Sequence, residues 1–375
     1  MKLNYNFKNY NFLLLATVIV LNIVGILAVS SAANQDEAIV TRQIMGSMAG
    51  VASCVIVSLI DYRKILKYAG LIFLIGLGFL AAVLAIGVVR GGAGRWIDMP
   101  VIGRIQPAEF FKITFIIYFA AFFERHEEDL NRPQFFFLAV AIFLVSATLI
   151  FLEPNLSTTI ILGVIFAGMF FAAGLSFKWI GGILGVSLPF FLLFLYTFTT
   201  DLYKKIPFLA DYQKDRIAGF LDPSRIGDRA LQQQNALMAI GSGGLLGKGL
   251  YNTDIGSVKA GNFLMEEDTD FIFAIIGEEL GFRGCLLIFA GFVLVISLML
   301  VTAARAKDMG GRVLCAGMSV WIGFQTFTNI AVATSLFPNT GVTLPFFSRG
   351  VSSLLALYIG LGLVLNVGLQ RKSYQ

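Results

Sequence analysis

The residues best suited to chemistry lie in the stretch 265–281, which reads Met-Glu-Glu-Asp-Thr-Asp-Phe-Ile-Phe-Ala-Ile-Ile-Gly-Glu-Glu-Leu-Gly. Four of its first six residues are acids, and an apolar segment follows directly after Asp270. A carboxylate at such a boundary between water and lipid can be kept partly dry, which raises its basicity and suits it to proton abstraction. We therefore take Asp270 as the candidate base and expect positions 266–268 to form a solvated acidic loop before a helix.

The composition of the whole chain is that of a membrane protein. Hydrophobic residues fill 57% of the 375 positions and charged residues only 14%, against about 25% charged in ordinary globular chains. The mean hydropathy is +0.81. The net charge of +5 is small for this length, and no basic block with interleaved aromatic residues occurs. We expect contact with membrane lipids and no nucleic-acid partner.

Cysteine and histidine usage gives no sign of a metal centre. Cys54, Cys285 and Cys315 each lie in an apolar run without a Cys-x-x-Cys partner, so they are expected to be small buried hydrophobic residues. His126 is the only histidine and stands in a charged stretch that is typical of a solvated loop. We therefore expect no metal ligands among these residues.

Apolar runs of membrane-spanning length predict the architecture. A helix needs about 20 apolar residues to cross the hydrocarbon layer. Ten runs qualify, at 11–31, 43–60, 68–89, 106–123, 134–152, 157–174, 179–200, 280–303, 313–335 and 350–368. The fold class is therefore an all-α polytopic membrane protein of about ten helices, forming one domain over 1–375. Lys and Arg concentrate in the short loops on the side of the termini, which places both termini in the cytoplasm.

Two segments on the opposite face are unusual. Residues 90–106 contain several glycines, which permit tight backbone turns, and Trp96, whose ring suits the headgroup level. The second segment is one large extracytoplasmic loop at about 201–269, which is rich in basic residues. These basic side chains suit either the binding of a phosphate-bearing lipid substrate or general anchoring to anionic headgroups. Its glycine-rich run 239–249 lacks Walker spacing, but its backbone N–H groups could receive a pyrophosphate.

Ionisable residues also occur within or beside the predicted spans. Glu109 and Lys112 share a helix face at the start of the fourth span, so they are either functional or a structural ion pair near the interface. Glu153 stands in the turn between spans five and six and could be an ordinary loop acid. The segment 337–350 has two prolines, and such broken backbone at membrane depth must be buried or line a cavity.

Taken together, these motifs resemble the SEDS family (shape, elongation, division and sporulation), which includes RodA, FtsW and SpoVE. The resemblance rests on an ordered set of matches from the third span to the tenth. They are Gly94-Arg95-Trp96, Gln106-Pro-Ala-Glu-Phe-Phe-Lys112, Glu153-Pro-Asn-Leu-Ser-Thr158, Tyr212-Gln-Lys-Asp-Arg216, Phe220-Leu-Asp-Pro223, Ala239-Ile-Gly-Ser-Gly-Gly244, Gly247-Lys-Gly249, Thr269-Asp-Phe-Ile-Phe273, Gly277-Glu-Glu-Leu-Gly281, Leu344-Pro-Phe-Phe-Ser348 and Ser352-Ser353. Two stretches depart from the family pattern. Asn155 replaces an Asp and Ser157-Thr158 replaces Gly-Thr, and Ser348-Arg349-Gly-Val351 stands where Ser-Tyr-Gly-Gly is usual.

The resemblance implies a peptidoglycan glycosyltransferase that polymerises lipid II at the outer face of the bacterial cytoplasmic membrane. It implies an inverting hexosyl transfer that forms a β-1,4 link and releases undecaprenyl pyrophosphate, with Asp270 as general base. It also implies a class B penicillin-binding protein as partner and leaves a divalent cation, Mg²⁺ or Mn²⁺, as an open expectation. The substrate-binding candidates are Arg95, Trp96, Gln106, Glu109, Lys112, Asn155, Arg216, Ser242, Lys248, Thr269, Ser348 and Arg349.

Two other classes of function compete with the enzyme. A lipid II flippase would line a translocation path with Glu109, Lys112 and the broken segments, and it would be expected to carry an inverted repeat. No convincing repeat occurs in the sequence. A non-catalytic scaffold for the transpeptidase would make Asp270 dispensable. The role in elongation, division or sporulation is left open by the sequence.

Overall fold

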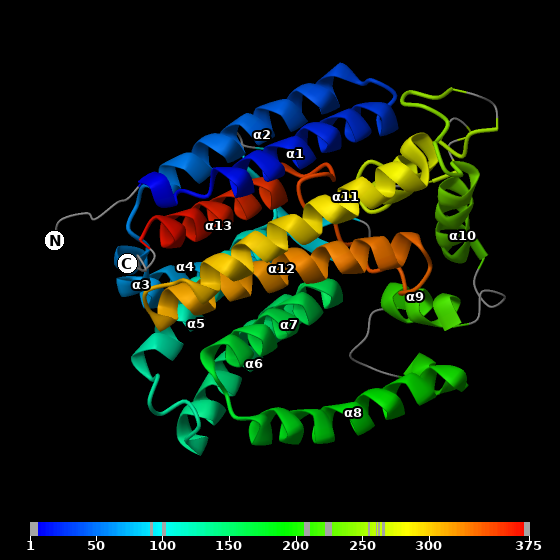
Figure 1. The fold of residues 1–375 in the computed structure, drawn as a ribbon. Helices are drawn as coiled ribbons and strands as arrows, with labels where there is room; N and C mark the ends of the chain where they lie inside the picture. Colours follow the sequence, from blue (N-terminus) through cyan, green and yellow to red (C-terminus); the bar gives the residue numbers. More distant parts are fainter. Residues whose placement is uncertain are drawn as a thin grey trace.

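The computed structural model describes residues 7–90, 93–99, 103–205, 211–221, 227–253, 256–259, 261, 263–264 and 267–370. Most of these residues form long helices that lie side by side (Figure 1). The long helices are α1 (Phe12–Ala32), α2 (Glu37–Ser58), α4 (Ala69–Ile86), α5 (Pro107–Arg125), α6 (Pro133–Leu152), α7 (Leu156–Ala173), α8 (Phe177–Thr199), α11 (Ile272–Ala304), α12 (Met309–Ala333) and α13 (Val351–Leu369).

The helices correspond to the apolar runs of the sequence. Within the described residues, eight helices are long and apolar enough to cross a membrane, and each coincides with an expected span. The two remaining expected spans coincide with α5 and α8. The polytopic helical fold is therefore confirmed, while the count of ten spans stays a prediction.

The start of α1 and the end of α13 lie at the same end of the bundle (Figure 1). Before α1 stands the short helix η1 (Phe7–Asn9), and a Cβ added at Gly368 in α13 would lie 3.8 Å from the Asn9 carbonyl oxygen. This arrangement is the one expected of an even number of spans. A further short helix, α3 (Tyr62–Lys67), connects α2 to α4 at the same end of the bundle (Figure 1).

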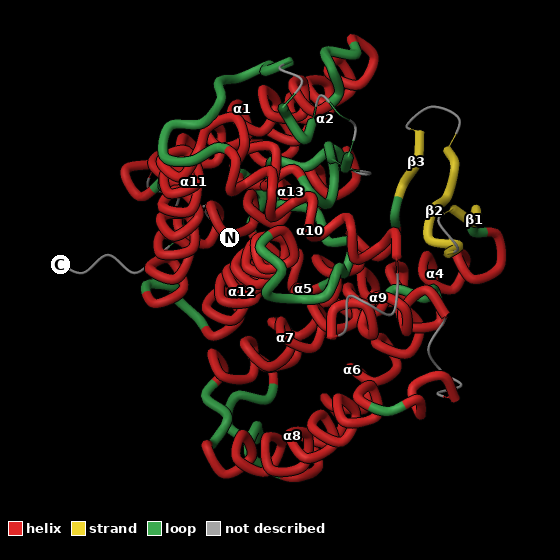
Figure 2. Tube along the Cα trace, turned by 90° about the vertical axis from the view of Figure 1, so that its right-hand side faces the viewer, coloured by secondary structure: helices red, strands yellow, loops and turns green. Residues whose placement is uncertain are grey.

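A small antiparallel sheet follows α4, and the sequence did not predict it. Its strands are β1 (Val88–Arg90), β2 (Ala93–Met99) and β3 (Gly103–Ile105), paired in the order β1-β2-β3 (Figure 2). Trp96 pairs with Val88, and Asp98 pairs with Arg104. Strands β1 and β3 have only three residues each, and β2 and β3 contain glycine, so neither length nor alternation marked the sheet in the sequence.

The large loop between α8 and α11 contains helices of its own. These are η2 (Asp201–Lys205), α9 (Asp211–Leu221) and α10 (Gly227–Ser242). Figure 1 shows α9 and α10 beyond the ends of α7 and α12, at the end of the bundle away from α3. The loop therefore forms a folded cap over one end of the helices, where the sequence indicated only its length and charge.

Close packing holds the centre of the bundle, where α12 and α13 are the most buried helices. Small residues allow the backbones to approach: a Cβ at Gly50 in α2 would lie 2.4 Å from the Tyr358 ring in α13. A Cβ at Gly362 would lie 2.6 Å from the Cys54 carbonyl oxygen. Such small-residue contacts are a principal means of joining helices in a membrane. Cys54 and Cys315 are buried as free thiols, as expected, whereas the free thiol of Cys285 is only half-buried.

Helix α11 is kinked at Gly281, which has φ 66° and ψ −168°. This conformation is open to glycine and costly for other residues. A Cβ at this position would also lie 2.3 Å from the Gly247 nitrogen, because the large loop passes against the kink. The expected span began at 280, next to the kink, and did not include the buried helical segment before it, which begins at Ile272.

Candidate active site

Asp270 lies two residues before the start of α11, and a side chain of α12 holds its backbone in place. The Asn329 side chain donates to the Asp270 carbonyl oxygen at 2.8 Å and to the Val342 carbonyl oxygen at 2.7 Å. Asn329 is fully buried. One amide thus ties the residue before α11 to the segment between α12 and α13, which restricts the positions that the Asp270 carboxylate can reach.

The carboxylate of Asp270 and the guanidinium of Arg216 meet at Gly341. A Cβ added at Gly341 would lie 3.2 Å from Asp270 Oδ2 and 3.4 Å from Arg216 Nη1. Gly341 has φ +68°, a backbone conformation that side chains with a Cβ rarely adopt. Both charged side chains are half-buried. The structure therefore brings together two predicted site residues, the candidate base Asp270 and the cation Arg216, that are 54 positions apart in the sequence.

Helix α9 places Arg216 through contacts with the turn between α6 and α7. Gln213, one turn earlier on the same helix, donates to the Pro154 carbonyl oxygen at 3.4 Å. Residues three apart share a helix face, so Arg216 follows Gln213 on the side that faces this turn. The same turn reaches the loop between α12 and α13, residues 334–350, here called the last loop. The contact is made by Ser157, which donates through Oγ to the Thr340 carbonyl oxygen.

The last loop is fastened to the segment before Asp270. Ser348 donates through Oγ to the Thr269 carbonyl oxygen at 2.6 Å and accepts from the Leu344 nitrogen at 2.7 Å. The Arg349 guanidinium lies 3.0 Å from Asp268 Oδ2, and the Arg349 nitrogen donates to the Asp268 carbonyl oxygen at 2.8 Å. Ser348 and Arg349 thus hold the site segment in place, which is a role the sequence did not specify.

The expectation of a solvated acidic loop at 266–268 is wrong where the structure describes it. Asp268 is buried and paired with Arg349. Glu267 is half-buried, and burial together with the nearby Asp268 carboxylate raises its pKa to about 7. Glu266 lies outside the described residues. Asp268 is paired with Arg349, a residue 81 positions later that local sequence could not reveal.

The turn between α6 and α7 is also organised by a predicted site residue. Arg95 on β2 donates to the carbonyl oxygens of Glu153, at 3.3 Å through Nε, and of Pro154. Asn155 caps α7 by accepting from the Thr158 nitrogen at 3.3 Å. The side chain of Glu153 is fully buried, which the sequence did not indicate. Burial raises the pKa of Glu153 to about 8, and the charge of Arg95 offsets part of this rise.

Glu109 and Lys112 form a buried ion pair in the first turns of α5. Their Nζ and Oε1 atoms lie 2.7 Å apart, and Lys112 is fully buried. Lys112 also donates to Gln325 Oε1 at 3.2 Å and lies 4.6 Å from the centre of the Trp321 ring. These partners hold Lys112 inside the bundle, and its roles as a site residue and as a structural ion pair both stay predictions.

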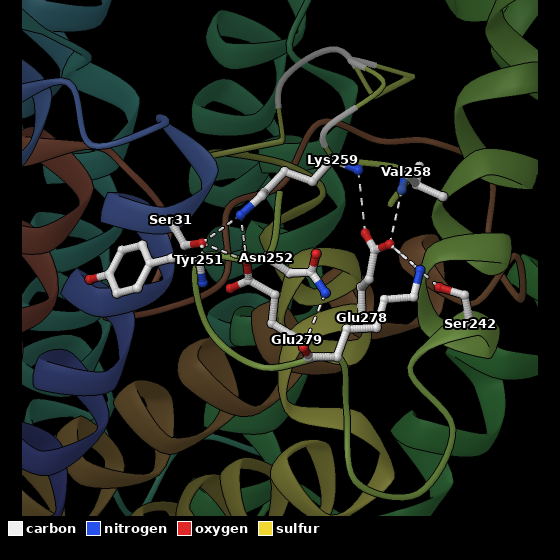
Figure 3. Close-up of polar contacts among 9 residues, drawn as sticks. Ser31, Ser242, Tyr251, Asn252, Val258, Lys259, Glu278 and Glu279 are labelled. Carbon is white, nitrogen blue, oxygen red and sulfur yellow. Dashed lines mark hydrogen bonds and ion pairs between the residues drawn. The ribbon is translucent and has the colours of Figure 1, made fainter. Parts of the chain in front are cut away.

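A second polar cluster, built on Glu278 and Glu279 in α11, connects the large loop to the bundle. Glu278 Oε1 lies 2.7 Å from Lys248 Nζ and accepts from the Val258 nitrogen at 2.9 Å. Glu279 Oε1 lies 2.5 Å from Lys259 Nζ, with both side chains 2% exposed. Figure 3 shows Lys259 reaching between Glu279 and Ser31 of α1, where Ser31 Oγ accepts from Nζ at 2.8 Å. The sequence missed Lys259, Glu279 and Ser31 as partners because they come from three distant segments.

The glycine-rich run 239–249 docks on α11 and does not form the phosphate-binding loop considered from the sequence. The Lys248 nitrogen donates to the Glu278 carbonyl oxygen at 2.9 Å, and the Gly249 nitrogen donates to the Glu279 carbonyl oxygen at 3.0 Å. A Cβ at Gly243 would lie 2.0 Å from the Gly277 carbonyl oxygen. The glycines are needed for this approach of two backbones, and these N–H groups are already used inside the protein.

The remaining predicted residues lie at several places around the bundle. Trp96 is half-buried on β2, and Gln106 precedes α5 with its nitrogen donating to Ser352 Oγ at 3.4 Å. Ser242 ends α10 and donates through Oγ to the Ala239 carbonyl oxygen at 2.8 Å. Among the described residues, no group of three or more His, Cys, Asp or Glu side chains is arranged to hold a metal ion.

Comparison with known proteins agrees with this fold and site. Residues 7–373 match the FtsW, RodA and SpoVE family of cell cycle proteins. The chain is 32% identical over 365 residues to the peptidoglycan glycosyltransferase MrdB of Escherichia coli strain K12, covering 96% of this chain and 93% of that protein. It is 31% identical over 395 residues to a probable peptidoglycan glycosyltransferase FtsW of Geobacter metallireducens, covering 99% of both.

Solved structures show the same architecture. A chain of a peptidoglycan synthase complex, described as coordinating polymerization and crosslinking, superposes with a TM-score of 0.78 at 25% identity, covering 96% of this chain and 98% of that one. The rod shape determining protein RodA of Thermus thermophilus superposes with a TM-score of 0.70 at 25% identity over 99% of both chains.

The fold and site thus define a multi-pass protein of the bacterial inner membrane with a charged site at one end of its helix bundle. The chain belongs to the FtsW, RodA and SpoVE family, as the ordered motifs of the sequence predicted.

Proposed function

We propose that this protein is a peptidoglycan glycosyltransferase that polymerises lipid II. The observation that carries the proposal is the meeting of Asp270 and Arg216 at Gly341, in a chain whose relatives are named peptidoglycan glycosyltransferases. A reaction between two lipid-linked sugars needs a base for the attacking hydroxyl and positive charge for the departing pyrophosphate. The two side chains supply these requirements at one place.

In the proposed reaction, Asp270 takes the proton from the 4-hydroxyl of the acceptor GlcNAc. The hydroxyl oxygen forms a bond to the anomeric carbon of the donor MurNAc, and the bond from that carbon to the pyrophosphate oxygen breaks. The configuration inverts, which gives a β-1,4 link and free undecaprenyl pyrophosphate. A positioned base contributes about 10²- to 10⁴-fold to such a step, and the holding of two membrane-anchored sugars contributes much of the rest.

Arg216 is the proposed partner of the leaving pyrophosphate. A guanidinium presents a planar fork of donors that suits phosphate oxygens. Lys112 and Lys248 were the other candidates, and their ammonium groups are held by Glu109 and Glu278. Arg216 is therefore the cation that the geometry favours, because it lies beside Asp270 at Gly341.

Two further components are part of the proposal. A class B penicillin-binding protein, which would crosslink the strands, is supported by the likeness to a chain from a complex that couples polymerization to crosslinking. A divalent cation would bind through substrate phosphates and one carboxylate, as Mg²⁺ commonly does, so it needs no ready-made cluster of protein ligands. In such a site the cation would screen pyrophosphate charge next to Asp270.

The function is tested by supplying purified protein, with its transpeptidase partner, with lipid II in detergent and in liposomes. The proposal predicts glycan strands whose length grows with time. Transfer of lipid II across the liposome membrane without any polymer would support the flippase instead. Polymer formed by the partner alone at the same rate would support the scaffold.

A further inference from the structure

Glu153 is a buried acid that the proposed reaction does not yet use. It ends α6 with its side chain 0% exposed. Among the described residues, neither of its carboxyl oxygens has a hydrogen-bond partner. Buried polar atoms are nearly always hydrogen-bonded, and each exception requires a physical explanation. Within the part of the chain that the structure describes, Glu153 is the buried side chain with two such atoms.

Two neighbouring polar atoms share this property. Asn155 Nδ2 and Thr340 Oγ1 are also buried without a hydrogen-bond partner in the described part of the chain. Asn155 is two residues from Glu153, and Thr340 is joined to the same turn by Ser157. We call Glu153, Asn155 and Thr340 the Glu153 cluster. It combines a carboxyl, an amide donor and a hydroxyl where the α6–α7 turn meets the last loop.

The Glu153 cluster adjoins the reacting groups. Thr340 directly precedes Gly341, the residue at which Asp270 and Arg216 meet. Gln213 holds α9 to Pro154, the residue after Glu153. A sugar whose hydroxyl reached Asp270 would therefore extend other polar groups toward this turn.

The environment of Glu153 favours its neutral form. An ionised carboxylate buried without hydrogen bonds is strongly disfavoured, so such a group binds a proton. Burial raises the pKa of Glu153 to about 8. The positive charge of Arg95 on β2 lowers this pKa in part. The other charged groups nearby, Arg216 and Asp270, lie at Gly341, the residue after Thr340. A protonated carboxyl offers one donor and one acceptor, which suits an uncharged ligand group.

We propose that the Glu153 cluster is a subsite in which protonated Glu153 hydrogen-bonds to an uncharged hydroxyl or acetamido group of the sugar that reacts at Asp270. This inference rests on the proposed glycosyl transfer. The cluster contributes no cation, so it is unsuited to the pyrophosphate, and its mixture of donors and acceptors matches an N-acetylated sugar. Glu153 acts on binding and orientation, and Asp270 remains the base.

The test compares Glu153→Ala, Glu153→Gln and the wild-type protein in lipid II polymerisation from about pH 6 to about pH 9. Removing the hydrogen-bonding group should lower kcat/KM by roughly tenfold in the Ala variant. Gln also donates and accepts and carries no charge, so it should restore most of this loss. Wild-type activity should fall as the pH rises through about 8, where Glu153 loses its proton, and Glu153→Gln should lack this decline. Glu37→Gln, which alters an exposed acid at the start of α2, is the matched control.

A second readout is independent of turnover. The infrared difference spectrum between wild type and Glu153→Gln at pH 7 should contain the carbonyl band of a protonated carboxyl group, and added lipid II should shift that band. A band that shows an ionised carboxylate would overturn the inference, as would equal alkaline decline in wild type and Glu153→Gln. A protonated band that lipid II shifts, in a protein that forms no polymer, would support the subsite and contradict the proposed function.

Discussion

The carboxylate of Asp270 and the guanidinium of Arg216 lie against the same side of Gly341, within 3.2 Å and 3.4 Å of the position that a Cβ would occupy there. Neither residue is near the other in sequence, and neither comes from the same element as Gly341. The site thus depends on three segments: the residue before α11, helix α9 and the loop between α12 and α13.

Substitution of Gly341 by Ala should impair activity much more than folding. The positive φ alone costs about 1 kcal/mol for a residue with a Cβ, and the methyl group would push Asp270 and Arg216 apart. A displacement of this kind should lower polymerisation by about 100-fold. Gly350→Ala in the same loop is the matched control, because its Cβ would approach only Ser353, at 3.9 Å. Equal activity of the two variants would show that the meeting at Gly341 is irrelevant to the reaction.

Arg216→Lys should retain binding of the anionic substrate while losing rate. Lysine keeps the positive charge but lacks the planar fork that holds two phosphate oxygens. We expect kcat to fall at least about tenfold with little change in KM, and Arg216→Ala to affect both. Lys214→Met, which removes a cation two residues away on α9, should change neither constant greatly. Full activity of Arg216→Lys would assign the residue to general electrostatic attraction.

The pair of Lys259 and Glu279 should contribute to stability mainly through the penalty for separating it. Both side chains are 2% exposed, so removal of one partner leaves a buried charge and should cost about 3–5 kcal/mol. The double variant Lys259→Met with Glu279→Leu should lose less than either single variant. Thermal unfolding of the wild type, the two single variants and the double variant measures the coupling energy between the two residues. The exposed pair Arg104 and Asp98 is the comparison and should contribute at most about 1 kcal/mol.

Glu267 should make the protein less stable as the pH rises through the acid range. Its pKa is raised from 4.5 to about 7, so the folded state holds its proton more tightly than the unfolded state does. Its stabilising contribution is complete below about pH 4.5 and is lost as the pH approaches about 7. The difference in Tm between Glu267→Gln and wild type should therefore be small at the lower pH, grow over this window and then level off. A difference that is constant with pH would contradict the burial of this side chain.

The sequence predicted the helices well because a membrane span is a local property of length and hydropathy. Leu14 and Val18 of α1 are buried while Leu13 and Val20 are exposed, yet all four are apolar, so the span was evident without any knowledge of packing. The three short strands could not be found this way, because β1 and β3 gain their pairing only from β2. Helices α9 and α10 were missed because the loop was identified by its length and charge alone.

The roles of site residues were harder to predict, because they depend on partners that are far away in the sequence. Lys248 stands in a glycine-rich run, which favoured a phosphate site, but its ammonium is held by Glu278. Arg349 departs from the family pattern, and the structure pairs it with Asp268. Glu153 was taken as a possible loop acid, since nothing in its neighbours in sequence shows that its side chain is fully buried. Asp270 was identified because its signal is local: an acid that directly precedes an apolar helix.

The central claim is that Asp270 takes the proton from the attacking hydroxyl, and the most direct test is lipid II polymerisation by Asp270→Asn. The asparagine keeps the shape of the side chain and removes its capacity to accept the proton. Together with the transpeptidase partner, the variant should bind lipid II and unfold at the wild-type temperature while forming no glycan strands, and Asp98→Asn on the exposed sheet should remain active. Glycan strands formed by Asp270→Asn at the wild-type rate would contradict the claim and remove Asp270 from the reaction.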